Sequence, residues 1–131
     1  MITGLHHINL RAPAALLAML RDFYRDVLGL SVGPRPDFGS PGFWLYAGGQ
    51  PIVHLSEQRP NEVKHGPVDP AAPGTFDHAA FQGDDPRATA AHLAALGITF
   101  RESRSPVTGQ HQFFLKDPAG NGVEINFPYQ G

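Results

Sequence analysis

Cysteine is absent from this chain of 131 residues, which excludes disulfides, thiolate metal ligands and cysteine nucleophiles. An excess of positive charge is also lacking, because 10 Lys and Arg stand against 12 Asp and Glu, so a nucleic acid is not an expected partner. No apolar run is long enough to cross a bilayer, and the first residues lack the pattern of a signal peptide. We therefore expect a cytoplasmic protein that binds neither a membrane nor a nucleic acid.

The residues that are present favour a folded domain and a role for histidine. Hydrophobic residues make up 41% of the chain and charged residues 17%, which argues against disorder. Seven histidines are present, and without cysteine any zinc or iron site must use His, Asp, Glu or water. Histidine is therefore the residue type to follow along the chain.

The predicted elements occur twice in the same order. In the first half we expect one strand, one helix and three strands, at residues 5–10, 14–28, 30–32, 42–46 and 51–55. In the second half we expect the same elements at residues 76–81, 86–96, 98–101, 112–116 and 123–127. The fold class is thus α+β, with two βαβββ modules at about 1–57 and 75–131 and a linker at 58–74. Side by side, the modules would form a single domain with a curved, cup-shaped mixed sheet and helices on its outer face.

Strand alternation brings four side chains to the face that the helices leave bare. Aligning the two halves pairs His7 with His78 and His54 with Glu124, each expected in the middle of a strand. Taken singly, each histidine could be an ordinary packed or surface residue, but the symmetric positions favour a common role. Imidazoles and a carboxylate suit one divalent metal ion, which could be Fe, Mn, Zn, Ni or Co. The predicted metal ligands are His7, His54, His78 and Glu124. His6 has the opposite parity and is expected at the edge of the core.

Aromatic and polar side chains share that bare face, which is typical of a pocket for a small-molecule substrate. The candidate substrate-binding residues are Trp44, Tyr46, Gln112, Phe114 and Lys116. For Trp44 and Phe114, contact between the modules is an equally good interpretation.

Five segments resemble the vicinal oxygen chelate superfamily: LHHINL, FYRDVLGL, PIVHL, FDHAAF and KDPAGNGVEI. This superfamily includes glyoxalase I, extradiol ring-cleaving dioxygenases, methylmalonyl-CoA epimerase, fosfomycin-resistance thiol transferases and bleomycin-resistance proteins. The resemblance implies that His7, His78 and Glu124 match metal ligands common to the enzymes of the superfamily, whereas the position of His54 varies among them. It also implies a homodimer, in which two-module chains of this kind usually close their cups.

The resemblance implies a metalloenzyme that acts on a small molecule with two adjacent oxygens. Glyoxalase-type lyase or isomerase chemistry is the first expectation, with the metal as Lewis acid and His54 and Glu124 as the catalytic residues. His54 stands where glyoxalase I has a glutamate, so it is either a fourth ligand or a base. One alternative is extradiol-type ring cleavage, although Phe114 replaces the tyrosine common in those enzymes. The other is a non-catalytic binding or resistance protein.

Overall fold

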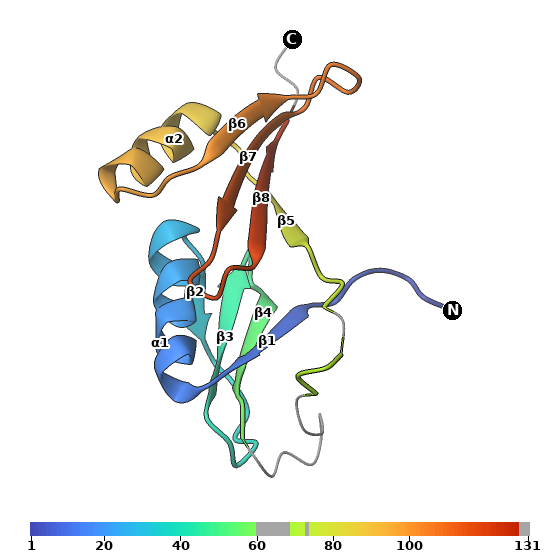
Figure 1. Cartoon of the computed structure of the whole chain (residues 1–131), viewed down its shortest axis with the longest axis vertical. Helices are drawn as coiled ribbons and strands as arrows, with labels where there is room; N and C mark the ends of the chain where they lie inside the picture. The colour runs from blue at the N-terminus through green and yellow to red at the C-terminus, as the bar shows by residue number, and fades with distance from the viewer. Residues whose placement is uncertain (60–68, 73, 129–131) are drawn as a thin grey trace. The chain divides into compact units, whose positions relative to one another are not determined.

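The computed structural model describes residues 1–59, 69–72 and 74–128 (Figure 1). Its contacts divide the chain into two compact units, Met1–Pro73 and Gly74–Gly131. The predicted linker at 58–74 falls largely outside the described residues. Each unit contains one helical region and one four-stranded sheet.

The first unit has the strand order β1-β4-β3-β2, with β1 parallel to β4 and the other neighbours antiparallel. Its elements are β1 (Ile8–Ala12), α1 (Ala14–Asp22), the π-helix η1 (Phe23–Val27), β2 (Ser31–Gly33), β3 (Gly42–Ala47) and β4 (Gln50–Glu57). The helix α1 contacts β1, β3 and β4. Its side chains Leu17 and Leu20 are fully buried, as are Leu45 of β3 and Val53 of β4. These apolar residues form the core of the first unit.

The helix expected over 14–28 is present, but its second part is a π-helix. Hydrophobic spacing does not reveal such a local widening, because the buried face still carries Phe23 and Tyr24. Gly29 follows with a φ of +76°, the left-handed conformation that commonly ends a helix. Among the described residues, no helix has the length and hydropathy needed to cross a membrane.

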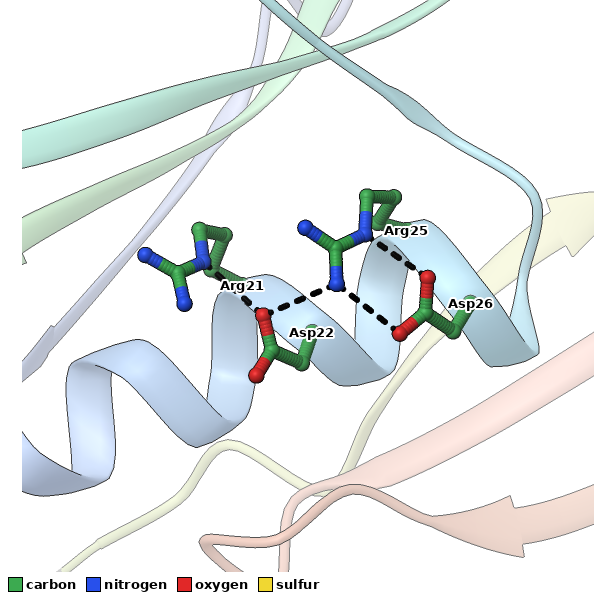
Figure 2. Close-up of polar contacts among 4 residues, drawn as sticks. All are labelled: Arg21, Asp22, Arg25 and Asp26. Atoms are coloured by element: carbon green, nitrogen blue, oxygen red, sulfur yellow. Dashed lines mark hydrogen bonds and ion pairs between the residues drawn. The ribbon is translucent and has the colours of Figure 1, made fainter.

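The outer face of α1 and η1 carries a chain of ion pairs (Figure 2). Arg21 Nε lies 2.9 Å from Asp22 Oδ1, and Arg25 Nη2 lies 3.1 Å from the same oxygen. Arg25 also donates two hydrogen bonds to the carboxylate of Asp26, from Nε over 2.7 Å and from Nη2 over 2.9 Å. The hydrogen bond from Arg25 lowers the pKa of Asp26 below its usual value. All four side chains are partly exposed, so this face meets solvent.

The second unit has the order β5-β8-β7-β6, again with one parallel pair, β5 and β8. Its elements are β5 (His78–Gln82), α2 (Pro86–Ala95), β6 (Arg101–Arg104), β7 (His111–Lys116) and β8 (Gly122–Phe127). α2 begins where the side chain of Asp85 accepts a hydrogen bond from the backbone N–H of Ala88 over 3.0 Å. Leu93, Phe113 and Phe127 are buried in the core of this unit.

The two units repeat the same topology and register. Trp44 lies opposite His54 on neighbouring strands of the first sheet, and Phe114 lies opposite Glu124 at the equivalent place in the second. The predicted α+β class with two βαβββ modules is therefore confirmed.

Two of the four predicted ligands are not in the middle of a strand, so that expectation is wrong for them. His7 precedes β1, which begins at Ile8, and His78 is the first residue of β5. β5 cannot begin earlier in its parallel ladder, because its partner β8 begins at Gly122, opposite His78. His54 and Glu124 do lie within β4 and β8.

Candidate metal centre

The second unit brings two of the predicted ligands to a distance that suits one ion. His78 opens β5 and Glu124 lies in the neighbouring strand β8, with His78 Nε2 3.5 Å from Glu124 Oε2. Two ligands about 2.1 Å from a metal, at angles of about 90–110°, are separated by about 3.0–3.4 Å. The observed separation is close to this range, and it is longer than an ordinary N–H···O hydrogen bond.

The remaining polar atom of each of these side chains already has a partner. His78 Nδ1 lies 2.7 Å from Asp77 Oδ2, and because a carboxylate only accepts, the ring must donate from Nδ1. Gln112 Nε2 donates to Glu124 Oε1 over 2.7 Å. When His78 is neutral, the lone pair of its Nε2 and the oxygen Oε2 of Glu124 are thus the acceptors that face each other.

Because Glu124 is buried, its carboxylate needs a neighbouring positive charge to offset the cost of its lost hydration. Glu124 is only 8% exposed, and a buried carboxylate is costly unless it is paired, hydrogen-bonded or bound to a metal. The pKa of His78 is raised, first by its hydrogen bond to Asp77 and, against the opposing effect of desolvation, by the charge of Glu124. Either a proton on His78 or a metal ion between the two side chains would supply the positive charge.

The turn between β7 and β8 fixes where this pair stands. The buried carboxylate of Asp117 accepts backbone hydrogen bonds inside the turn, and Gly120 adopts a φ of +84°. Gly122 then passes so close to β5 that a Cβ there would lie 2.4 Å from the carbonyl oxygen of Asp77 and 2.7 Å from Cβ of His78. Only glycine allows this approach, which explains the last glycine of the DPAGNG segment.

The first unit holds its two predicted ligands as stacked rings. The ring centroids of His7 and His54 are 3.7 Å apart with planes inclined by 13°, and Trp44 stacks on the other side of His54 at 4.2 Å and 14°. The lone pair of an imidazole nitrogen lies in the plane of the ring. Nearly parallel, stacked rings therefore direct their lone pairs into separate planes, and one ring would have to turn before both could bind the same ion.

His54 is held more firmly than His7. Its Nε2 lies 3.0 Å from the carbonyl oxygen of Pro51 and must donate to it, which leaves Nδ1 as the acceptor. Burial is the main cause that lowers the pKa of His54, and the positive charge of a protonated His7 adds to it. The ring is therefore neutral near pH 7, as both a metal ligand and a general base require.

His7 has a neighbour at the same ring atom as His78. His6 Nδ1 lies 2.8 Å from His7 Nδ1, so one of the two rings donates and the other accepts. His6 is exposed, and the expectation that it sits at the edge of the core is wrong. Because β1 begins only at Ile8, His6 lies before the strand and its alternation does not apply to it.

The predicted substrate-binding residues lie on β3 and β7, with different contacts. Trp44 covers His54, and Gln112 is occupied by Glu124. Tyr46 donates its hydroxyl to the carbonyl oxygen of Pro34. Lys116 is exposed at the end of β7, and Phe114 packs under the guanidinium of Arg101 with 4.5 Å between Cζ and the ring centroid.

The predicted ligands occur as two pairs, one in each unit. Within the described part of the chain, no group of three or more His, Asp or Glu side chains is gathered closely enough to hold a metal. Sequence reasoning missed Asp77, although its place directly before His78 in FDHAAF, equivalent to His6 before His7, was a visible signal.

The sequence profile of the Glyoxalase/Bleomycin resistance protein/Dioxygenase superfamily matches residues 4–125. The chain belongs to this superfamily. The resemblance drawn from the short motifs is thereby confirmed, while no protein of curated function matches the chain in sequence.

Solved structures of similar fold match nearly the whole length of this chain. Lactoylglutathione lyase from Agrobacterium tumefaciens is 24% identical with a TM-score of 0.70, covering 98% of this chain and 96% of that one. A glyoxalase family protein from Bacillus anthracis is 22% identical with a TM-score of 0.73, covering 97% and 96%. A genomically encoded fosfomycin resistance protein from Listeria monocytogenes is 18% identical with a TM-score of 0.68, covering 98% and 95%. At these identities the likeness establishes the fold alone.

Proposed function

We propose that this protein is a divalent-metal-dependent enzyme that acts on a small molecule with two adjacent oxygens, by glyoxalase-type lyase or isomerase chemistry. The observation that carries the proposal is the pair formed by His78 and Glu124. Their free atoms Nε2 and Oε2 face each other at 3.5 Å, and their other polar atoms are held by Asp77 and Gln112. Membership of the Glyoxalase/Bleomycin resistance protein/Dioxygenase superfamily supports the choice of reaction class.

In this proposal His7, His78 and Glu124 hold the ion, and His54 is either a fourth ligand or the base beside it. The ion is Fe, Mn, Zn, Ni or Co in its divalent state. Neutral imidazoles and one carboxylate suit these metals, and the carboxylate offsets part of the charge. The two pairs must come together to complete the set, either from one chain or from two copies. Such an ion would act as a Lewis acid on a carbonyl oxygen of the substrate.

The protein's own groups would do the proton transfer and the binding. His54 is neutral and has Nδ1 free, so it can accept a proton from a substrate carbon, with Trp44 fixing its plane. Lys116 lies near enough for its charge to act on His78, and it would attract an anionic end of the substrate. Tyr46 and Phe114 would add apolar surface around that substrate.

Extradiol-type ring cleavage is the second candidate, and the stacking of His7 on His54 favours it. If His54 keeps its present orientation, the ligand set reduces to His7, His78 and Glu124. Two histidines and one carboxylate with open positions are the ligand set of non-haem Fe(II) oxygenases. His54 would then act as a base beside the iron.

Metal analysis of the full chain, purified without a His-tag, tests the proposal. We expect about one divalent ion per chain, because the proposed ligands form one set of two imidazoles and one carboxylate. Turnover of hemithioacetals, lost with a chelator and restored by the metal, is expected for the lyase, and turnover of catechols would select the second candidate. Tight binding of a small molecule without metal or turnover would contradict both and indicate a resistance-type binding protein.

A homodimer is also part of the proposal, because both sheets have open edges. The edge strands are β1 and β2 in the first sheet and β5 and β6 in the second. Uncovered edges invite pairing with another chain. Light scattering at micromolar concentration should give the mass of a dimer, and a monomer mass would contradict the assignment.

A further inference from the structure

We propose that Asp77 is a positioning residue that orients His78 as a metal ligand, and that His6 has the equivalent task beside His7. The inference rests on the proposed function, because it concerns how the ligands of that metal are held. Neither Asp77 nor His6 is one of the predicted metal ligands.

The two units provide the same contact independently. Asp77 Oδ2 lies 2.7 Å from His78 Nδ1, and His6 Nδ1 lies 2.8 Å from His7 Nδ1. In both units the partner is the residue directly before the histidine, and in both it meets Nδ1 rather than Nε2. Aspartate and histidine differ in charge and shape. What the two contacts share is the partner's place directly before the histidine and the ring atom that it contacts, Nδ1.

Occupying Nδ1 determines which nitrogen of the ring is available. A carboxylate that accepts from Nδ1–H fixes the tautomer whose lone pair is on Nε2. In the second unit this is the atom that faces Glu124. Histidine ligands of metals commonly donate their other N–H to a carboxylate, which fixes the ring plane and makes the ligand more basic.

Folding does not explain the contact of Asp77. Its side chain is 89% exposed, and exposed ion pairs contribute little to stability. Holding His78 is therefore the role that the geometry leaves for Asp77. His6 is a weaker partner than a carboxylate, because its ring is neutral when it accepts a hydrogen bond.

The test compares metal affinity across matched variants of the full chain. The dissociation constant for Zn²⁺ is measured by competition with a chromophoric chelator for the wild type, Asp77→Ala, Asp77→Asn and His6→Ala. Asp84→Ala is the control, because it removes the same charge from an exposed position in the same unit. We expect Asp77→Ala to bind about 10–100-fold more weakly, the usual loss for such partners. Asp77→Asn, which can still accept from Nδ1–H, should be partly rescued, His6→Ala should lose less than Asp77→Ala, and the control should be unchanged.

A second readout does not depend on metal. Nitrogen-15 NMR of the imidazoles in metal-free protein should place the proton of His78 on Nδ1 in the wild type and move the population towards Nε2 in Asp77→Ala. An unchanged tautomer population, or unchanged Zn²⁺ affinity in Asp77→Ala while His78→Ala loses the metal, would overturn the inference and leave the proposed function standing. A wild type that binds no metal, or full affinity in both His78→Ala and Glu124→Ala, would overturn both.

Discussion

The two units have one backbone plan but carry different chemistry at the equivalent places. In the first unit, rings of Trp44, His54 and His7 stack with nearly parallel planes. In the second, hydrogen bonds and an ion pair link Asp77, His78, Glu124 and Gln112 in a line. The repeat therefore fixes the positions, since His54 and Glu124 occupy equivalent strands, whereas the side chains at those positions differ in chemistry. The first unit contributes stacked rings, and the second contributes the carboxylate of Glu124.

This division predicts that the equivalent residues Glu124 and His54 will respond differently to truncation. Glu124→Ala removes the only carboxylate of the proposed set, so its loss of metal affinity should exceed the roughly 10–100-fold typical of residues that only support a ligand. His54→Ala should keep the metal and lower kcat by about 10²–10⁴-fold, the usual contribution of a general base. Metal content and kcat, measured on the same preparations, check both expectations.

The control for His54→Ala is His54→Phe, which can still stack between Trp44 and His7 but has no nitrogen. If His54 is a base, both variants should keep the metal and be equally slow. Loss of metal in both variants would make His54 a ligand. Full metal occupancy in Glu124→Ala would show that Glu124 is not a metal ligand.

Neighbouring residues on β7 test whether the two faces of the second sheet differ as the comparison requires. Phe113 is buried in the core, and Phe113→Ala should lower the free energy of unfolding by about 3–5 kcal/mol. Phe114 lies on the opposite face beside Glu124, so Phe114→Ala should cost clearly less. Urea denaturation measures both variants. Equal costs would contradict the assignment of faces, and Leu45→Ala against Trp44→Ala repeats the test in the first unit.

The fold could be predicted because its signals are local and repeated. Apolar periodicity, the turns and the alignment of the halves predict the order of the elements and the face that carries His54 and Glu124. Strand ends were less predictable, because where β1 and β5 begin depends on the partner strand and not on their own residues. This is why the sequence places His7 and His78 in the middle of strands, whereas in the structure His7 precedes β1 and His78 is the first residue of β5.

The contacts of the site could be predicted only in part. Alternation places His54 and Trp44 on one face, but the plane of a ring depends on its neighbours in space, so the stack of His7, His54 and Trp44 has no sequence signal. The hydrogen bond from Gln112 to Glu124 likewise depends on register across two strands. The role of Asp77 was within reach, because the repeat alignment already placed it beside a histidine.

Because Gly122 lies so close to β5, replacing it should cause a loss of stability smaller than that expected for Phe113→Ala. Gly122→Ala would place a Cβ 2.4 Å from a backbone oxygen, which cannot move without separating β8 from β5. We expect a loss of about 1–3 kcal/mol in the free energy of unfolding, as for other overpacked sites, with weaker metal binding because His78 shifts. Gly74→Ala is the matched control, since a Cβ there would meet nothing within 4 Å. Equal stability of the two variants would contradict the account of the turn.

The smallest effect is expected for Asp26, an exposed carboxylate of the first unit that corresponds in character to Asp77 of the second. Asp26 in the first unit and Asp77 in the second each have a pKa lowered chiefly by a hydrogen bond from a basic neighbour, Arg25 or His78. Asp26 lies on the solvent face of η1, so Asp26→Asn should leave metal affinity unchanged and slightly lower the melting temperature at pH 7.

The sign of the pH dependence follows from the lowered pKa of Asp26. The ionised carboxylate stabilises the folded state above the unfolded pKa of 3.8, and this contribution disappears as the pH falls through the lower folded value. The difference in melting temperature between wild type and Asp26→Asn should therefore shrink as the pH is lowered below that range. In an Arg25→Ala background the effect of the substitution at pH 7 should be smaller, because both hydrogen bonds from Arg25 to Asp26 are gone. A difference of undiminished size in that background would show that Arg25 is not the main partner of Asp26.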